Sequence, residues 1–406
     1  MDNTYIFVTR LFNGLFESVQ NETWNPTGIP TIVKLSEKIS RRHKLVWVIV
    51  CKNRTESAVV HDRYKRLNMN GIDFHIIPYR QLFFSNKIND FISDMVTWRY
   101  CIRLYDRMAN GLIFYFGRSN IVPAAFIKLC TNAGVVIRIL GVYPDQKRLA
   151  VEFLTKLFNP MKFIAYKIRY DLAVCTQDGS GTEYFIGKLL NKATPTKIWL
   201  NGVEKTVGIA AKCNPIISIL FVGKLVDDKG ILELIAAARN IKRKGINFNL
   251  NIIGKGVLLE HIRDLCHDWD IAENVRLVGS VEHNRIGAYY KNADIYVSLN
   301  KMGNLSNTVI EAMAAGKCTI ILAGDSKFHT DAYTGNVIPE DAVIRIDRNN
   351  IVAHLTRTLT DLLENHARIR AYSRKMVEFS KTFLWTWDER INHEVKLLEK
   401  ISTSVV

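Results

Sequence analysis

Short apolar runs alternate with amphipathic stretches along all 406 residues of the chain. The longest runs, such as Leu45–Cys51 and Ile216–Val222, are only about seven residues long, which suits buried strands. The stretches between them carry apolar residues at helical spacing. Strands that alternate with helices form parallel sheets covered by helices on both faces. The sequence therefore predicts an α/β protein, and one expected helix covers Ser57–Asn68.

The length of the chain indicates two domains. A chain of 406 residues is too long for one ordinary core and fits two domains of roughly 200 residues each. The alternating pattern lapses near Val203–Asn214, where Gly202, Gly208 and Pro215 cluster. We therefore predict one doubly wound, Rossmann-like sheet in residues 1–205 and a second in residues 206–384.

Composition excludes several classes of protein. Hydrophobic residues make up 48% of the chain and charged residues 23%, as in a globular protein. No apolar run approaches the roughly 20 residues of a membrane-spanning helix. The segment Met1–Val8 has the pattern of a first strand and not of a signal peptide. The seven cysteines are scattered without a C-x-x-C pair, which favours reduced thiols, a cytoplasmic location and no zinc site.

Positive charge is concentrated in the N-terminal half. Residues 1–200 contain 28 Lys and Arg against 15 Asp and Glu, a net charge of +13, whereas the remainder has 27 against 24, a net charge of +3. This asymmetry favours an anionic partner, namely nucleic acid, an anionic membrane surface or a phosphorylated acceptor. A generally basic proteome would also produce it.

Two glycine-rich turns follow apolar runs in the C-terminal half. Gly223–Gly230 (GKLVDDKG) follows Ile216–Val222, and Gly303–Lys317 (GNLSNTVIEAMAAGK) follows Ala293–Leu299. In parallel α/β sheets such turns lie at the carboxyl ends of strands, where ligands bind. Helix N-termini there offer N–H groups and a positive dipole to phosphate. The two turns therefore predict one phosphate-binding site.

In this order and about 80 residues apart, the two turns resemble the donor domain of glycosyltransferase family 4. Leu200–Val203 is similar to the turn that ends the first domain in this family, and Ile252–Gly256 to a glycine loop near the nucleotide base. Phe383–Trp387 resembles the start of a terminal helix that returns to the first domain, here at about 385–406. The resemblance implies the GT-B fold, in which two Rossmann-like domains face each other across a cleft. It also implies sugar transfer from a nucleoside diphosphate with retention of anomeric configuration, without cofactor or metal.

The resemblance assigns roles in the donor site. Lys224 and Lys229 would hold the diphosphate and stabilise it as a leaving group, and Glu311 would bind the ribose. Relatives usually have arginine where Lys224 stands, and a lysine keeps the charge without the bidentate geometry. The other expected donor-binding residues are Gly223, Gly254, Gly256, Asn304, Leu305, Ser306, Asn307 and Thr308.

One position departs from the family pattern. Relatives carry a further glutamate that contacts the donor sugar, and this chain has Gly303 eight positions before Glu311. The resemblance then leaves sugar recognition to the amides of Asn304–Asn307 and the side chains of Asn304, Ser306 and Asn307. A different interpretation of Glu311 stays open, because Thr308-Val309-Ile310-Glu311 also spells a capping box at the start of a helix.

The N-terminal half offers acceptor-binding candidates. Gly28 lies in the expected loop before the first long helix. Arg118, Arg138 and Asp145 lie in or after predicted strands. A histidine common in relatives is absent near Leu140. These segments are equally consistent with strand-end loops that have no special role.

Two further patterns were weighed. Asp268-Trp269-Asp270 spells the D-x-D metal motif of another glycosyltransferase architecture, but it ends a predicted surface helix. Lys147–Tyr170 mixes basic and aromatic residues at helical spacing, which suits a helix at an anionic membrane as well as a buried helix with a basic outer face.

The sequence thus predicts a glycosyltransferase that uses a nucleotide-sugar and a cell-surface polysaccharide or polyprenyl-linked glycan as acceptor. It would be cytoplasmic, with peripheral binding to the inner face of the cell membrane as an option, and would not bind nucleic acid. A sugar-nucleotide epimerase of the same fold is one alternative. A basic nucleic-acid-binding protein is another.

Overall fold

The computed structural model describes residues 3–83, 85–108, 111–204 and 215–404. The chain divides into two compact units. The first unit comprises Met1–Gln177, Thr182–Asn201 and Trp387–Val406, and the second comprises Asp178–Gly181 and Gly202–Thr386. Part of the predicted boundary, residues 205–214, lies outside the described residues. The short segment Asp178–Gly181 joins the second unit, which no sequence pattern indicated.

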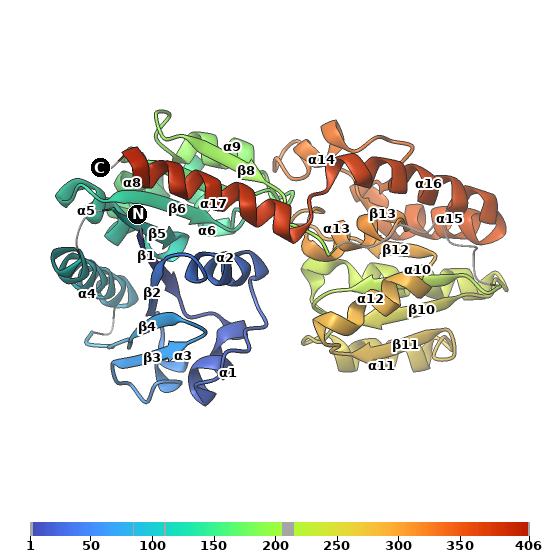
Figure 1. The fold of residues 1–406 in the computed structure, drawn as a ribbon. Helices are drawn as coiled ribbons and strands as arrows, with labels where there is room; N and C mark the ends of the chain where they lie inside the picture. The colour runs from blue at the N-terminus through green and yellow to red at the C-terminus, as the bar shows by residue number, and fades with distance from the viewer. Residues whose placement is uncertain (1–2, 84, 109–110, 205–214, 405–406) are drawn as a thin grey trace. The chain divides into compact units, whose positions relative to one another are not determined.

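The first unit is built on a sheet in the order β3-β4-β2-β1-β5-β6-β7-β8 (Figure 1). All neighbouring strands are parallel except β3 and β4. The strands are β1 Thr4–Arg10, β2 Lys44–Val50, β3 Lys65–Met69, β4 Ile72–Ile77, β5 Leu112–Gly117, β6 Gly134–Ile139, β7 Leu172–Thr176 and β8 Thr196–Trp199.

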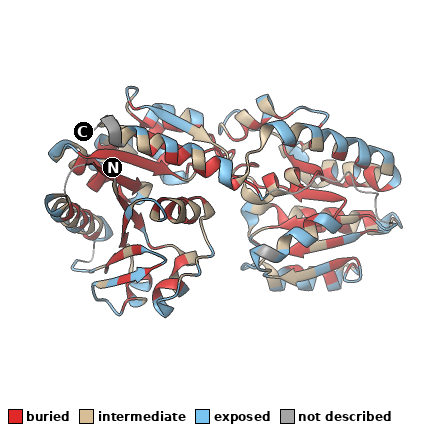
Figure 2. Cartoon of the chain, viewed as in Figure 1, coloured by how far each residue is buried: buried red, intermediate tan, exposed pale blue. Residues whose placement is uncertain are grey.

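Helices cover both faces of this sheet because its strands are apolar on both sides. In β1, Ile6 and Val8 pack into one core layer and Tyr5 and Phe7 into the other. One layer includes α4 Asn86–Arg107, α5 Ile121–Cys130, α6 Pro144–Val151, α8 Pro160–Lys167 and α9 Thr182–Leu189. The other includes α1 Asn13–Asn21, α2 Pro30–Ser40 and α17 Trp387–Ser404. Figure 2 shows the strands buried between these layers. The short helices α3 Arg54–Ala58, α7 Phe153–Phe158 and η1 Arg118–Asn120 complete the unit.

The predicted helix over Ser57–Asn68 is wrong. Helix α3 ends at Ala58, and Lys65–Met69 is strand β3, paired antiparallel with β4. The turn between them is Asn70-Gly71, and both residues have positive φ, 53° and 73°. Asn-Gly is the preferred pair for a two-residue hairpin turn. This local signal determined the structure more strongly than the helical spacing of the apolar residues.

The second unit contains an all-parallel sheet in the order β11-β10-β9-β12-β13-β14. Its strands are β9 Ser218–Val222, β10 Asn249–Ile253, β11 Val275–Gly279, β12 Ile295–Ser298, β13 Cys318–Leu322 and β14 Val343–Ile346. Its helices are η2 Asp227–Lys229, α10 Ile231–Arg243, α11 Leu259–Asp268, α12 His283–Asn292, α13 Asn307–Ala314, α14 Ala332–Val337, η3 Arg348–Asn350, α15 Ile351–Glu364 and α16 His366–Phe383. The two sheets confirm the predicted two-domain α/β architecture.

The C-terminal helix α17 is fixed to the first unit by buried charges. Glu394 accepts a hydrogen bond from Tyr115 at 2.5 Å and pairs with Arg390 at 2.7 Å and Arg138 at 3.9 Å. All three charged side chains are fully buried. Burial alone would raise the pKa of Glu394, but the two guanidinium groups hold it below the ordinary value. A buried carboxylate so paired ties the end of the chain to strands β5 and β6.

No helix in the described part of the chain is long and apolar enough to cross a membrane.

Candidate functional site

Each sheet has a point where the strand order reverses, and ligands bind beyond the carboxyl ends of strands at such points. In the second unit this point lies between β9 and β12, because β10 and β11 extend the sheet one way and β13 and β14 the other. In the first unit it lies between β1 and β5.

In the second unit, the loops after β9 and β12 touch through a glycine. Gly230 has φ +66° and is the N-cap residue of α10. A Cβ atom at Gly230 would lie 2.4 Å from Cβ of Leu299, which follows β12. The amide of Lys301 also donates to the carbonyl of Asp228 at 2.8 Å. The backbone approach explains why glycine stands at position 230, and it places the two predicted turns side by side.

The loop after β10 packs against the same turn. Gly254 has φ +147°, and a Cβ atom there would lie 1.8 Å from the carbonyl oxygen of Gly223. A Cβ atom at Gly256 would lie 2.3 Å from the carbonyl oxygen of Leu225. The amide of Leu225 donates to the carbonyl of Lys255 at 3.1 Å. The loops after β9, β10 and β12 therefore pack backbone against backbone at the reversal point. We call the surface that these three loops form the bed.

Two lysines lie in this bed. Lys224 is exposed and Lys229 is partly buried. Burial lowers the pKa of Lys229, and the nearby Lys224 ammonium lowers it further, although Asp228 and Asp178 oppose this. Neither ammonium forms an ion pair with any residue that the structure describes. Two neighbouring cations without a paired anion, one of them desolvated, favour a bound anion.

The backbone explains why Gly303 carries no side chain. Its φ is +145°, and a Cβ atom would lie 2.6 Å from the carbonyl oxygen of Asp178 and 2.8 Å from the amide nitrogen of Ser180. The amide of Leu305 donates to that same Asp178 carbonyl at 3.1 Å. Segment Asp178–Gly181 thus occupies the space where a glutamate at 303 would start.

The loop after Gly303 is held by a buried carboxylate. Asp331 accepts from the amide of Asn304 at 2.7 Å and from its Nδ2 at 2.9 Å, and Ser298 donates to Asn304 Oδ1 at 3.0 Å. Asn304 is fully buried. Burial raises the pKa of Asp331 to about 6, despite these hydrogen bonds and Arg348 at 3.5 Å. The predicted donor-binding groups of Asn304 and the amide of Leu305 are therefore engaged within the loop.

The remaining candidates lie at the start of α13. Ser306 is the residue before the helix, and Ser306, Asn307 and Thr308 are all partly exposed. Because α13 begins at Asn307, Thr308 lies inside the helix and cannot be its N-cap. The capping-box interpretation of Glu311 is therefore wrong.

Glu311 is a mostly buried carboxylate on α13. Its side chain is 17% exposed, and His283 lies 4.0 Å away. Burial raises the pKa of Glu311, while His283 and the neighbouring Tyr290 hydroxyl act in the opposite direction. A desolvated carboxylate of this kind is a strong acceptor for hydroxyl groups of a ligand.

The first unit has a cavity of about 240 Å³ at its own reversal point. Arg10 ends β1, Lys52 follows β2, Arg118 follows β5 and Asp145 begins α6 after β6. These four strands are neighbours in the sheet, so their carboxyl ends converge. The other lining residues come from α4, η1, α5, α6 and α8: Asp90, Asp94, Ser119, Ile121, Gln146, Leu149, Lys162 and Tyr166.

Charged pairs shape this cavity. Arg118 lies over the Tyr143 ring at 3.8 Å, donates to Gln146 at 3.1 Å and is 3.5 Å from Asp145. Lys52 pairs with Asp94 at 2.8 Å. Burial raises the pKa of Asp94, although Lys52 and Lys162 act against it. Rigid donors and acceptors of this kind suit a hydroxyl-rich or phosphorylated ligand.

Two predicted acceptor-binding residues lie elsewhere. Arg138 is buried within the sheet, where it donates to the carbonyls of Ile139 and Val174 and to Thr176. Gly28 packs against Gly14, where a Cβ atom would lie 2.0 Å from the nitrogen of Gly28. Arg138 and Gly28 therefore have structural roles in the first unit. Arg10 and Lys52 line the cavity but were not predicted, although they follow predicted strands as Arg118 does and the same rule would have included them.

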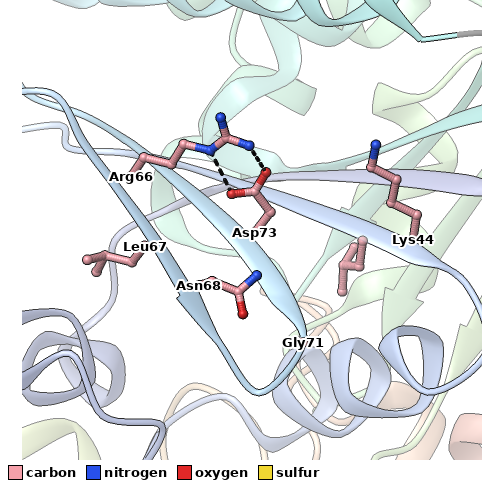
Figure 3. Close-up of a pocket in the computed structure, with 7 residues that line it drawn as sticks. Lys44, Arg66, Leu67, Asn68, Gly71 and Asp73 are labelled. Carbon is pink, nitrogen blue, oxygen red and sulfur yellow. Dashed lines mark hydrogen bonds and ion pairs between the residues drawn. The ribbon is translucent and has the colours of Figure 1, made fainter.

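Another cavity lies at the opposite edge of the same sheet. It is lined at the amino end of β2 by Lys44 and along the β3–β4 hairpin by Arg66, Asn68, Gly71 and Asp73 (Figure 3). Arg66 donates to Asp73 through two nitrogens, at 2.9 and 2.6 Å. Because the amino ends of strands face this cavity, it does not share the position at which α/β sheets bind ligands.

Asp268 ends α11, and Asp270 follows with φ +54°, so the D-x-D sequence lies at a helix terminus. Among the described residues, no group of three or more His, Cys, Asp or Glu side chains could hold a metal ion.

The chain is similar in sequence to known glycosyltransferases. Residues 214–376 match the family model "Glycosyl transferases group 1". An uncharacterized glycosyltransferase of Methanocaldococcus jannaschii is 26% identical over 349 residues, which cover 82% of this chain and 77% of the relative. A GDP-mannose-dependent alpha-(1-6)-phosphatidylinositol monomannoside mannosyltransferase of Mycobacterium tuberculosis is 29% identical over 116 residues, 27% of this chain and 30% of the relative.

Solved structures share the fold. Sucrose-phosphate synthase from Thermosynechococcus elongatus has a TM-score of 0.69 at 14% identity, covering 98% of this chain and 100% of that one. HepE from Anabaena, in complex with UDP, has a TM-score of 0.65 at 10% identity, covering 99% and 100%. The fold is the GT-B fold of glycosyltransferases. The chain is a glycosyltransferase, and residues 214–376 form its group 1 domain.

Proposed function

We propose that the protein is a glycosyltransferase of family 4 that takes a sugar from a nucleoside diphosphate and transfers it with retention of anomeric configuration. The observation that carries this proposal is the bed of three glycine loops with Lys224 and Lys229 unpaired by any described residue. Two ammonium groups beside closely approaching backbone loops suit the charge of a diphosphate. The UDP bound to the structural neighbour HepE supports this choice of ligand.

The donor-site residues of the second unit have the following roles in this proposal. Lys224 and Lys229 hold the diphosphate and stabilise the charge that develops on it as the sugar leaves. The buried carboxylate of Glu311 accepts hydrogen bonds from the ribose hydroxyls. Ser306 and Asn307, partly exposed before and at the start of α13, bind the sugar. Gly223, Gly254 and Gly256 keep the backbone close to the nucleotide. No step requires a metal.

The acceptor belongs to the first unit. Its cavity offers Arg10, Lys52, Arg118 and Asp145 as hydrogen-bonding groups for a glycan with an attached phosphate. We propose a cell-surface polysaccharide or a polyprenyl-linked glycan as acceptor and a cytoplasmic enzyme at the inner face of the cell membrane. The mycobacterial relative, named for a phosphatidylinositol mannoside, supports a lipid-linked acceptor.

Thermal stabilisation by a panel of nucleotides tests the donor part. UDP, GDP, ADP and their sugars are added separately to the full chain, with inorganic phosphate and nucleoside monophosphates as controls. One diphosphate base is expected to raise the Tm more than the matching monophosphate does. A ligand at 100 times its Kd would add roughly 2.7 kcal/mol of stability. Equal stabilisation by all anions would contradict a nucleotide site.

Product analysis tests the stereochemistry. NMR spectra of the glycoside are expected to show the anomeric configuration of the donor. An inverted product would exclude retention but would not contradict the proposed donor site.

A further inference from the structure

The helix α7 is apolar in sequence but does not pack into the protein. None of the residues of Phe153–Phe158 (FLTKLF) is buried. Phe153 is 75% exposed, and Leu154 and Phe158 are each 63% exposed. Met161 and Ile164 continue the exposed apolar surface onto α8. We define the α7–α8 surface by these exposed apolar residues: Phe153, Leu154, Leu157, Phe158, Met161 and Ile164.

Residues at the start of helix α4 extend this exposed apolar surface. Lys87 lies 5.4 Å from the centre of the Phe158 ring, which places the start of α4 beside α7. Ile88 and Phe91 on α4 are also exposed. Soluble proteins rarely leave large apolar side chains together on their surface unless a partner covers them. This group of exposed apolar residues is therefore a candidate interaction surface.

The charges beside the apolar residues determine the kind of partner. Residues 147–170 contain six Lys and Arg but one acidic residue, Glu152. Lys156 on α7 and Lys167 at the end of α8 lie 5.4 and 5.5 Å from the Phe163 ring, so two cations lie close to the helices that carry the α7–α8 surface. Burial lowers the pKa of Lys167, and Lys156 and Lys192 lower it further. Clustered cations that repel one another favour a polyanionic surface, and apolar groups between them favour its hydrocarbon interior.

The α7–α8 surface adjoins the cavity of the first unit. Lys162 lines that cavity, and its neighbours on α8, Met161 and Ile164, belong to the surface. Asp90 on α4 lines the cavity too, one residue before the exposed Phe91. A lipid whose chains stay in the bilayer could therefore place its polar head in the cavity.

We infer that the α7–α8 surface docks the enzyme on an anionic lipid bilayer and that the cavity beside it receives the polar head of a membrane-anchored acceptor. This inference rests on the proposed function for the identity of the acceptor. The docking itself does not, because lipid vesicles without any acceptor or donor reveal it.

Vesicle sedimentation tests the docking. The full chain is mixed with vesicles of phosphatidylcholine alone or with 30% phosphatidylglycerol, at low salt and at 0.5 M salt. Binding is expected only to the anionic vesicles and is expected to fade at high salt, where the Debye length falls to about 4 Å. Equal binding to neutral vesicles, or binding to neither, would overturn the inference.

A pair of matched variants locates the surface. Leu154→Ser with Phe158→Ser removes two apolar residues of α7. Leu129→Ser with Phe328→Ser removes the same residue types at positions that are 66% and 59% exposed elsewhere. The first variant is expected to lose vesicle affinity by about tenfold or more, because each apolar group contributes to insertion, and the second is expected to bind as the parent does. Equal effects of both variants would overturn the assignment.

The charge contribution has its own variant. Lys87→Gln with Lys156→Gln removes two cations next to the aromatic rings and is expected to weaken binding to anionic vesicles by roughly tenfold to thirtyfold. No change would mean that the charges do not face lipid. If sedimentation equilibrium shows a dimer that Leu154→Ser with Phe158→Ser converts to a monomer, while vesicles do not bind, the surface joins two copies of the chain and the inference is wrong.

Nucleotide stabilisation is measured on the same samples. A protein that binds vesicles but no nucleotide would contradict the donor site and leave the docking intact, and the reverse result would contradict only the docking.

Discussion

The two reversal points differ in what builds them. In the second unit, loops meet backbone to backbone, and glycines at 230, 254, 256 and 303 permit contacts that a Cβ atom would block. In the first unit, long side chains from β1, β2, β5, α4, α6 and α8 are held by ion pairs. A backbone-built site leaves a motif in the sequence, and a site built from side chains of distant segments leaves scattered charges.

The two units also differ in how their buried carboxylates are stabilised. Glu394 in the first unit faces two arginines, which hold its pKa below the ordinary value. Asp331 in the second unit faces mainly amide donors, and burial raises its pKa to about 6. One carboxylate is stabilised as an anion, and the other gains from protonation.

Among these predictions, removing an arginine that pairs with Glu394 is expected to have the largest effect on the free energy of unfolding. Arg138→Ala leaves Glu394 with a single arginine in the core and is expected to lower the free energy of unfolding by about 3–5 kcal/mol, the range for breaking a buried ion pair. Arg118→Ala, at the partly exposed cavity, is expected to cost about 1 kcal/mol or less. Guanidinium unfolding followed by circular dichroism measures both. Equal losses would remove the distinction between a structural and an acceptor-site arginine.

The backbone contacts of the second unit are tested by a pair of glycines. Gly254→Ala places a methyl group 1.8 Å from the Gly223 carbonyl at φ +147°, and it is expected to cost about 2–4 kcal/mol. Gly245 also has positive φ, +75°, but has nothing within 4 Å of a Cβ atom, so Gly245→Ala is expected to cost about 1 kcal/mol. The difference in unfolding free energy between the two variants measures the close approach. A difference near zero would show that the loops do not touch.

The pH dependence should have opposite signs at the two carboxylates. The folded pKa of Asp331, about 6, exceeds its ordinary 3.8, so the folded state holds a proton that the unfolded state has released. Its contribution to stability therefore falls by about 2–3 kcal/mol as pH rises from 4 to 6. For Glu394, whose pKa is lowered, the contribution is present above the ordinary pKa of 4.5 and is lost as pH falls through the lower folded value.

Comparison of Asp331→Asn with the parent isolates the first effect, because the variant cannot titrate there. The stability of the parent relative to Asp331→Asn is expected to decline from pH 4 to pH 6 and then to level off. A relative stability that rises over this range would mean that the carboxylate is held as an anion.

A smaller effect is expected at Glu311. Glu311→Gln keeps the size of the side chain but removes the charge-assisted bonds to a ribose, which should weaken nucleotide binding by about 1–2 kcal/mol. Stability should hold or improve, because burial already disfavours the charged form. Isothermal titration calorimetry gives the affinity. Unchanged affinity would leave the carboxylate without a role in the donor site.

Much of the fold could be predicted from the sequence, and the reasons are local. The apolar runs Ile216–Val222 and Ala293–Leu299 agree with β9 and β12 within about two residues, because buried parallel strands are continuous apolar runs. Helix α4, Asn86–Arg107, was not predicted, since its polar residues obscure the helical spacing. The hairpin at Asn70-Gly71 was missed although its turn signal was present.

Some parts of the candidate sites could likewise be predicted from the sequence, and others could not. The turns around Gly223 and Gly303 were found because glycine is required where backbones touch. Segment Asp178–Gly181, which fills the space beside Gly303, was not found, because nothing in its sequence indicates a contact more than 120 residues away. Arg138 was misjudged because a strand-end arginine and a buried one look alike until the partner, Glu394, is placed.

The most direct test of the account is nucleotide binding by Lys229→Ala. The nucleoside diphosphate that best stabilises the parent is titrated into the parent, Lys229→Ala and Lys244→Ala, the last being an exposed lysine at the other end of α10. The account predicts a loss of roughly 1.5–3 kcal/mol, or about tenfold to 150-fold in Kd, for Lys229→Ala, the range for a hydrogen bond to a charged group. It predicts no loss for Lys244→Ala and no loss of thermal stability without ligand for either variant. Equal affinity of Lys229→Ala and the parent would contradict a diphosphate site in the glycine loops of the second unit.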